Sequence, residues 1–127
     1  MEKELINRIQ CAVNFIEENL LDKIYIENIA KAALMSQSAF YVIFSNILGT
    51  TVKDYIRKRR LSLSTHDLVK SDESVLSIAL KYQYHTSESY SRAFKKLFGF
   101  SPKNFRERAL YVDVFPRVTL ICMNILG

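Results

Sequence analysis

A chain of 127 residues, 49% apolar and 24% charged, is by length one globular domain or two small lobes. Three glycines and two prolines favour helices over a turn-rich β fold, and no apolar run is long enough for a membrane-spanning helix. The two cysteines, Cys11 and Cys122, lie far apart without a CxxC pattern, which predicts reduced, buried thiols in a cytoplasmic protein.

The net charge of +5 is unevenly distributed. Residues 57–110 hold twelve Lys/Arg and five Asp/Glu, a net +7, whereas residues 1–56 hold five and seven, a net −2. A basic half this concentrated indicates a polyanion as partner, although a solvated basic face without a partner would have the same composition.

The first helix is predicted over residues 2–20, where Leu5, Ile9, Val13 and Ile16 recur near a 3.6-residue period. It carries no chemistry and is interpreted as scaffold. Residues 27–34 follow as a short helix, and Ser36 has the side chain of an N-cap for a second helix over residues 37–48, which Gly49 ends. Its predicted buried stripe is Phe40, Ile43, Phe44, Ile47 and Leu48.

A longer helix is predicted over residues 54–69 because neither Gly nor Pro interrupts it. Its expected core residues are Tyr55, Ile56, Leu61, Leu68 and Val69, and a cluster of basic side chains, Arg57 to Arg60, crowds its first turns. These arginines suit two roles. They can contact phosphates, or one of them can bond buried groups.

The second module repeats the first. A short helix is predicted over residues 75–82, then a turn, then a helix over residues 88–98 capped by Thr86 or Ser87 and ended by Gly99. Arg92 lies mid-face, where a guanidinium can reach a guanine edge, unless it only pairs with Glu88 one turn away. Lys95 and Lys96 suit phosphates better.

The two modules are related by an internal repeat. Ile29 and Ala30 recur 49 residues later, and five further positions recur 50 residues later: Phe40, Phe44, Gly49, Lys53 and Tyr55 match Tyr90, Phe94, Gly99, Lys103 and Phe105. A short helix, a tight turn and a second helix with a polar face is a helix-turn-helix pattern, here present twice.

Two segments resemble the AraC/XylS family of transcription regulators. They are Tyr55-Ile56-Arg57 with Arg60-Leu61, and Ile78-Ala79 through Ser91-Arg92-Ala93-Phe94-Lys95-Lys96 to Gly99, Ser101-Pro102 and Phe105-Arg106. The resemblance covers about residues 5–108. It implies an all-α fold of two helix-turn-helix lobes on a long central helix, each presenting one recognition helix to adjacent major-groove segments of double-stranded DNA. RNA polymerase is the further partner it implies, and no cofactor is expected.

The domains expected on this basis are residues 1–53 as first lobe, 54–70 as connecting helix, 71–110 as second lobe and 111–127 as an apolar tail. By position, the resemblance implies base contacts from Ser38, Tyr41, Val42, Ser87, Glu88, Ser89 and Arg92. Expected phosphate contacts are Arg57, Arg59, Lys95, Lys96, Lys103 and Arg106. Tyr41 could instead only cover its own helix.

The chain departs from the family at a few positions. Leu34 and Gln83 stand where the family usually has glycine, which costs little if the turn needs no positive φ. The first recognition helix has no charge between Gln37 and Leu48, although the family usually has a basic residue at the position of Val42. The second lobe is therefore expected to supply most of the electrostatic affinity.

The tail, residues 111–127, is β-branched and apolar without a helical period, which is typical of a strand. It resembles the start of a β-rich effector domain such as follows the DNA-binding half in some family members. The same composition also suits a tail that packs on the lobes, or one that mediates dimerisation, so that monomer and dimer both stay open.

These observations favour a sequence-specific DNA-binding transcription regulator, an activator by resemblance. The alternative is a ligand- or protein-binding module whose basic face is incidental. An enzyme is not expected, because the sequence has no nucleophile–base pair and no phosphate-cradling glycine loop. His66 and His85 have no ligand spacing with each other or with a cysteine, so no metal site is predicted.

Overall fold

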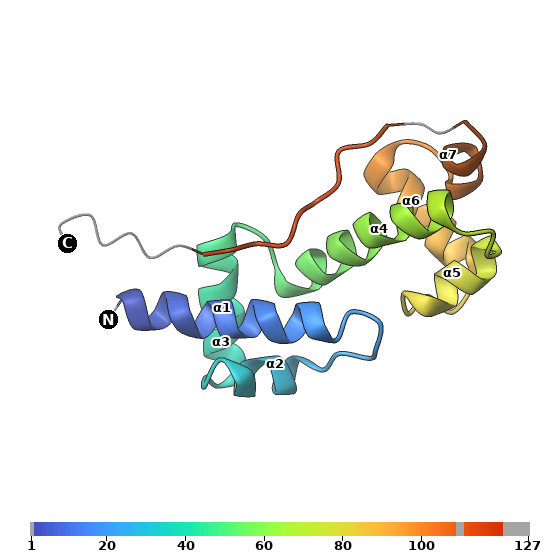
Figure 1. Ribbon diagram of the computed structural model, residues 1–127. Coiled ribbons are helices and arrows are strands. Elements are labelled where there is room, and N and C mark those ends of the chain that lie inside the picture. Colours follow the sequence, from blue (N-terminus) through green and yellow to red (C-terminus); the bar gives the residue numbers. More distant parts are fainter. Residues whose placement is uncertain (1, 109–110, 121–127) are drawn as a thin grey trace. The chain divides into compact units, whose positions relative to one another are not determined.

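The computed structural model describes residues 2–108 and 111–120 of the chain. This part forms seven helices and no strand (Figure 1). In chain order they are α1 (Glu2–Glu18), α2 (Ile26–Ala32), α3 (Gln37–Leu48), α4 (Val52–Lys70), α5 (Val75–Lys81), α6 (Ser87–Phe98) and α7 (Pro102–Arg108). The all-α prediction is confirmed. None of the described helices has the length and apolar character needed to cross a membrane.

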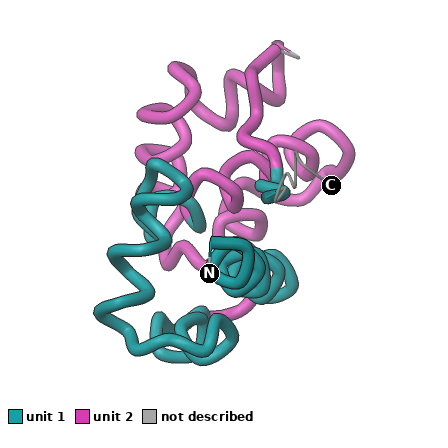
Figure 2. Tube along the Cα trace, turned by 90° about the vertical axis from the view of Figure 1, so that its left-hand side faces the viewer, with its two compact units in different colours: residues 1–20, 24–56, 117–127 teal, residues 21–23, 57–116 magenta. Residues whose placement is uncertain are grey.

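The described residues divide into two compact units (Figure 2). Of the described residues, unit 1 takes in residues 2–20, the range Ile24–Ile56, and tail residues 117–120. Unit 2 consists of Leu21–Lys23 and Arg57–Pro116. The division falls inside α4, so this helix contributes residues to both units.

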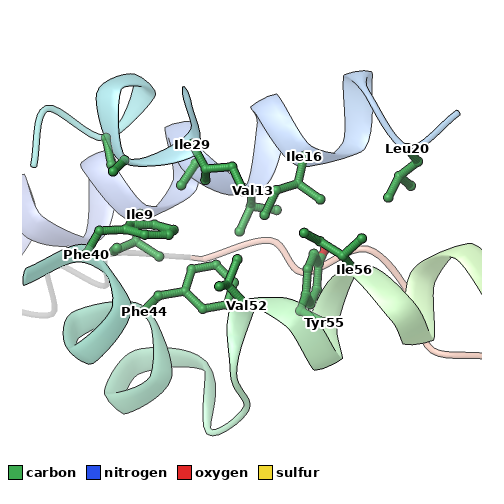
Figure 3. Packing of buried hydrophobic residues seen from close by; sticks show 13 residues of the cluster. Ile9, Val13, Ile16, Leu20, Ile29, Phe40, Phe44, Val52, Tyr55 and Ile56 are labelled. Carbon is green, nitrogen blue, oxygen red and sulfur yellow. The ribbon is translucent and has the colours of Figure 1, made fainter. Parts of the chain in front are cut away.

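The core of unit 1 is built from one apolar stripe on each of its helices (Figure 3). Ile9, Val13 and Ile16 of α1 recur at helical spacing and are fully buried. Phe40 and Phe44 of α3 pack with ring centroids 5.4 Å apart, and the ring of Tyr55 lies 5.9 Å from that of Phe44. The remaining buried members of the cluster are Ala12, Leu20, Ile29, Ala30, Ala33, Val52 and Ile56.

The core of unit 2 repeats this plan with more aromatic rings. Phe94 of α6 is fully buried, with ring centroids 5.8 Å from Tyr90, 4.8 Å from Phe98 and 5.7 Å from Phe105. Tyr90 occupies the repeat position of Phe40, and its buried hydroxyl needs a partner that phenylalanine does not need. The hydroxyl donates to Oγ of Ser64 at 2.7 Å. Burial raises the pKa of Tyr90.

Three residues expected in the core are exposed. Ile47 is 36% exposed, beside Leu5 and Ile6 in a shallow apolar hollow of unit 1. Val69 is 54% exposed because it follows the buried Leu68, and neighbouring helical residues point about 100° apart. Cys11 is exposed because it lies two positions from Ile9, on the other side of α1. Cys122 lies outside the described residues.

The predicted ends of both recognition helices are confirmed. Ser36 caps α3 because its side chain accepts a hydrogen bond from the backbone N–H of Ala39. Thr86 caps α6 because its side chain accepts a hydrogen bond from the backbone N–H of Ser89. Gly49 and Gly99 end the helices in the left-handed region, at φ 73° and 92°.

The turns that precede these helices require the left-handed region too. Leu34 has φ 57° and Gln83 has φ 71°. These turns do need a positive φ, so replacing the family's usual glycine is costly. A residue with a Cβ is strained by about 1–2 kcal/mol in the left-handed region. Gln83 has a compensating contact, since its Nε2 donates to the carbonyl oxygen of Leu21 at 2.6 Å.

Leu34→Gly is expected to stabilise the protein by about 0.5–1 kcal/mol, because relief of the left-handed strain exceeds the extra chain entropy of glycine. Leu34 is 74% exposed, so little apolar burial is lost. The measurement is the free energy of unfolding by denaturant. Leu34→Ala keeps the strained Cβ and should change stability little. Gly49→Ala should cost about 1 kcal/mol through φ alone, since nothing lies within 4 Å of its Cβ position. Equal effects of Leu34→Gly and Leu34→Ala would contradict the strain.

The described part of the tail, residues 111–120, is extended but forms no strand, contrary to its sequence pattern. A strand needs a neighbour with backbone groups to pair, and side chains of helices take its hydrogen bonds instead. The backbone N–H of Phe115 donates to Ser62 Oγ at 2.9 Å, that of Val118 to the Tyr55 hydroxyl at 3.2 Å, and that of Leu120 to Gln10 Oε1 at 2.6 Å.

The apolar side chains of the tail pack on both cores. Val112 packs on the core of unit 2, and Val118 and Leu120 pack on the core of unit 1. Residues 121–127 lie outside the described residues, and an effector domain starting in the tail stays a prediction.

Candidate nucleic-acid interface

The exposed faces of α3 and α6 correspond residue by residue. Both helices have twelve residues and the same cap positions, so a shift of 50 superimposes them. With Phe40 and Phe44 buried, the opposite face of α3 carries Ser38, Val42 and Asn46 at four-residue spacing, all exposed. The same positions on α6 are Glu88, Arg92 and Lys96, also exposed. Each helix therefore offers one stripe to solvent.

Arg92 stands at the middle of the α6 stripe. In the part of the chain that the structure describes, no ion pair joins it to Glu88, so a role for Arg92 limited to pairing with Glu88 has no support in the contacts. The Glu88 carboxylate instead accepts a hydrogen bond from the Ser87 hydroxyl at 3.5 Å. The guanidinium thus keeps its five donors for an external acceptor.

Ser89, a predicted base contact, belongs to the cap of α6. Its hydroxyl donates to the carbonyl oxygen of Thr86 at 3.0 Å and accepts from the Thr86 hydroxyl at 2.9 Å. Its backbone N–H donates to Thr86 Oγ1 at 3.0 Å. Ser89 is half-buried in this arrangement and holds the start of α6 in place. Among the second-lobe candidates, Arg92 and Glu88 are exposed, whereas Ser87 and Ser89 are half-buried.

The predicted phosphate contacts separate into two groups. Lys95 and Lys96, in the last turn of α6, and Lys103 on α7 are exposed. Arg59 is only 9% exposed, and its Nη1 donates to the carbonyl oxygen of Phe115 at 2.6 Å. Arg106 is half-buried and donates from Nε to Leu68 O at 2.8 Å and from Nη2 to Ser71 O at 3.3 Å, so it satisfies carbonyls at the end of α4. Arg59 and Arg106 thus bond carbonyl oxygens within the fold, and a phosphate contact from either stays a prediction.

The rest of the basic cluster on α4 is mixed. Arg60 donates from Nη2 to the carbonyl oxygen of Asp22 at 2.7 Å, and Lys58 Nζ lies 5.0 Å from the centroid of the Phe115 ring. Arg57 is half-buried. Burial raises the pKa of Tyr84, while the nearby charges of Arg57 and Arg60 act in the opposite direction. The structural role considered for this cluster thus holds for Arg59 and Arg60.

Arg106→Met is expected to destabilise the protein by about 2 kcal/mol, because two carbonyl oxygens at the end of α4 lose a charged donor. The measurement is the denaturant midpoint. Arg108→Met is the matched control, since Arg108 is exposed two residues away on α7 and its loss should cost less than about 0.5 kcal/mol. If Arg106 contacted a phosphate instead, its replacement would leave stability unchanged and lower the salt dependence of DNA binding by about one unit of slope.

The first-lobe candidates lie on an uncharged face. Val42 is 56% exposed, Tyr41 is 42% exposed, and Ser38 is exposed. The sequence interpretation omitted Ala39 and Asn46, which are exposed on the same helix. The 50-residue offset would have found both, since they correspond to Ser89 and Lys96.

Two modules, each with a capped second helix that buries aromatic residues on one side and exposes a polar stripe on the other, define a helix-turn-helix protein. A family model described as a helix-turn-helix domain matches residues 29–108, more than half of the chain. The chain belongs to the AraC/XylS-type helix-turn-helix family of transcription regulators.

Curated relatives agree with this assignment. The chain is 36% identical over 119 residues to the putative HTH-type transcriptional regulator YkgA of Escherichia coli K12, a match covering 91% of this chain and 50% of YkgA. It is 32% identical over 92 residues to the HTH-type transcriptional activator AarP of Providencia stuartii, covering 72% of this chain and 68% of AarP. The chain thus spans about half the length of YkgA.

The fold is shared with solved structures. The DNA-binding domain of AdpA, a global transcriptional factor crystallised with a target DNA, superimposes with a TM-score of 0.73 at 23% identity. The match covers 79% of this chain and 90% of that one. The two-module fold described above is therefore the fold of this family.

Proposed function

We propose that this chain binds double-stranded DNA sequence-specifically and regulates transcription, with α3 and α6 entering adjacent major-groove segments. The observation that carries the proposal is the α6 stripe: a rigidly capped helix exposes Arg92 between Glu88 and Lys96, and Arg92 is not paired with Glu88. Arginine bonds the O6 and N7 atoms of guanine bidentately in the major groove, which is the commonest specific contact in protein–DNA complexes.

The charges around α6 support the same conclusion. Lys95, Lys96 and Lys103 are exposed and can contact phosphates on either side of the groove. Arg57 stays a fourth candidate. If about four phosphates are neutralised, log affinity should fall against log salt concentration with a slope of roughly −4, less steep than a count including Arg59 and Arg106 would predict.

The regulatory direction and the protein partners are part of the proposal. AarP is a transcriptional activator by name, which supports activation by this chain. RNA polymerase as a further partner rests on the family resemblance alone. A regulator that acts on DNA in this way would work in the cytoplasm, and its activity would be binding and not catalysis.

The test is selection of binding sequences from a random duplex pool, followed by affinity measurements on an enriched duplex at several salt concentrations. Enrichment of two blocks about one helical turn apart would support insertion of both helices. A lack of binding even at low salt would overturn the proposal and favour a ligand- or protein-binding module whose basic face is incidental.

A further inference from the structure

The recognition stripes of α3 and α6 differ in chemistry more than in geometry. α6 carries Glu88, Arg92, Lys95 and Lys96, whereas α3 has no charged residue from Gln37 to Leu48. Val42 takes the central position that Arg92 takes on α6. Both recognition helices have the same length and the same cap positions, so they differ in which base edges their side chains suit.

Val42 has no role in the core of unit 1. It is 56% exposed and lies opposite the buried Phe40 and Phe44. A β-branched residue also has low helix propensity, so neither local structure nor packing favours valine at this exposed position. Ala39 adds a second exposed methyl group on the same side of the helix. The middle of the α3 stripe is therefore apolar where a DNA-reading helix needs contacts.

The major groove offers one apolar group for such a side chain. Thymine carries a 5-methyl group at the groove edge, and Ala, Thr and other small apolar side chains contact it. Guanine instead presents two acceptors, which are matched by the Arg or Lys donors that α3 lacks. The hydroxyl of Ser38, one turn before Val42, suits either kind of base pair. An α3 face of this composition fits A·T pairs.

We propose that α3 reads a thymine-containing segment through contact of Val42 with thymine 5-methyl groups. The DNA site then has two unlike blocks: one with guanine, read by Arg92 of α6, and one rich in A·T pairs, read by α3. The inference rests on the proposed function and specifies the sequence class that unit 1 recognises. Because a methyl contact releases no counterions, the contribution of α3 to specificity is independent of salt, unlike that of the lysines on α6.

The experiment uses the full chain and a duplex enriched from the random pool. Arg92→Ala identifies the block of α6 as the one whose specificity relaxes, and the remaining block is assigned to α3. A second duplex carries 2′-deoxyuridine in place of thymidine in the α3 block, which removes only methyl groups. Wild-type protein is expected to bind it about fourfold more weakly for each contacted methyl, the free energy of one buried methylene-sized group.

The matched variant is Val42→Ala, which shortens an exposed side chain and should leave folding intact. It is expected to bind the thymidine and deoxyuridine duplexes within about twofold of each other, since the partner of the methyl is gone. Deoxyuridine in the α6 block is the control and should change the affinity of both proteins equally. The wild-type salt slope should be the same on both duplexes.

Three results would overturn the inference and leave the proposed function standing. They are an α3 block of G·C pairs, a single enriched block, and equal losses on deoxyuridine for wild type and Val42→Ala. Failure to bind any duplex would instead overturn the proposed function itself.

Discussion

Arg92→Ala should weaken binding to the enriched duplex by about 1–3 kcal/mol and relax the preference at one base pair, because alanine cannot bond a guanine edge. The exposed guanidinium lies at the centre of the α6 stripe, so its removal changes neither the core nor the cap of the helix. The measurement is the dissociation constant on the enriched duplex and on the four base variants at the relaxed position.

Lys95→Ala is the matched control. It also removes one exposed positive charge from α6, but its position is suited to phosphate contact. It should weaken binding to all four duplexes by a similar factor and lower the salt slope by about one. If Arg92→Ala behaved in the same uniform way, Arg92 would be a phosphate contact and the guanine block would need another reader.

Phe94→Ala should have the largest effect on folding, about 3–5 kcal/mol, because it leaves a cavity where three other rings meet. That loss is a large fraction of the whole stability of a small domain. Unit 2 contains Phe94, so we expect amide-exchange protection to fall first in α5, α6 and α7, measured by hydrogen–deuterium exchange.

Lys95→Ala is the matched control for Phe94→Ala as well, because it changes the next residue of α6 at an exposed site. It should lower the free energy of unfolding by less than about 0.5 kcal/mol. Phe44→Ala, the equivalent change in unit 1, should instead expose the amides of α1, α2 and α3 first. Uniform loss of protection in both units for either variant would mean that the two cores unfold together.

Most of the fold was predictable from the sequence because its signals are local. The bounds of α3 and α6 follow from Ser36, Thr86, Gly49 and Gly99, and each of these acts on backbone groups within a few residues. The apolar stripes follow from the helical period, and the internal repeat shows that the second module has the same order of helices as the first. Two of the three wrong burial predictions, Ile47 and Val69, concern helix ends, where the period says which side a residue faces but not how far the core extends. The third, Cys11, lies within α1 on the side away from Ile9, and its burial was expected from residue type and not from the period.

The recognition face of α6 was equally predictable from the sequence, since spacing alone places Glu88, Arg92 and Lys96 opposite the buried Tyr90 and Phe94. The conformation of the tail was not predictable in this way. Its β-branched composition predicted a strand, but a strand exists only where another backbone is available to pair with it. In residues 111–120, side chains of Gln10, Tyr55 and Ser62 take those bonds.

The sequence by itself thus determined the helices, the repeat and the polar stripe that carries Arg92, because each depends on residues close together in the chain. Only the tertiary structure decided which arginines bond backbone carbonyl oxygens and which are exposed. Arg59 and Arg106 look as available as Arg92 in the sequence, but each bonds carbonyl oxygens between 35 and 56 residues away. A guanidinium on a long side chain bonds whichever acceptors the fold brings within reach, and the neighbouring sequence carries no sign of them.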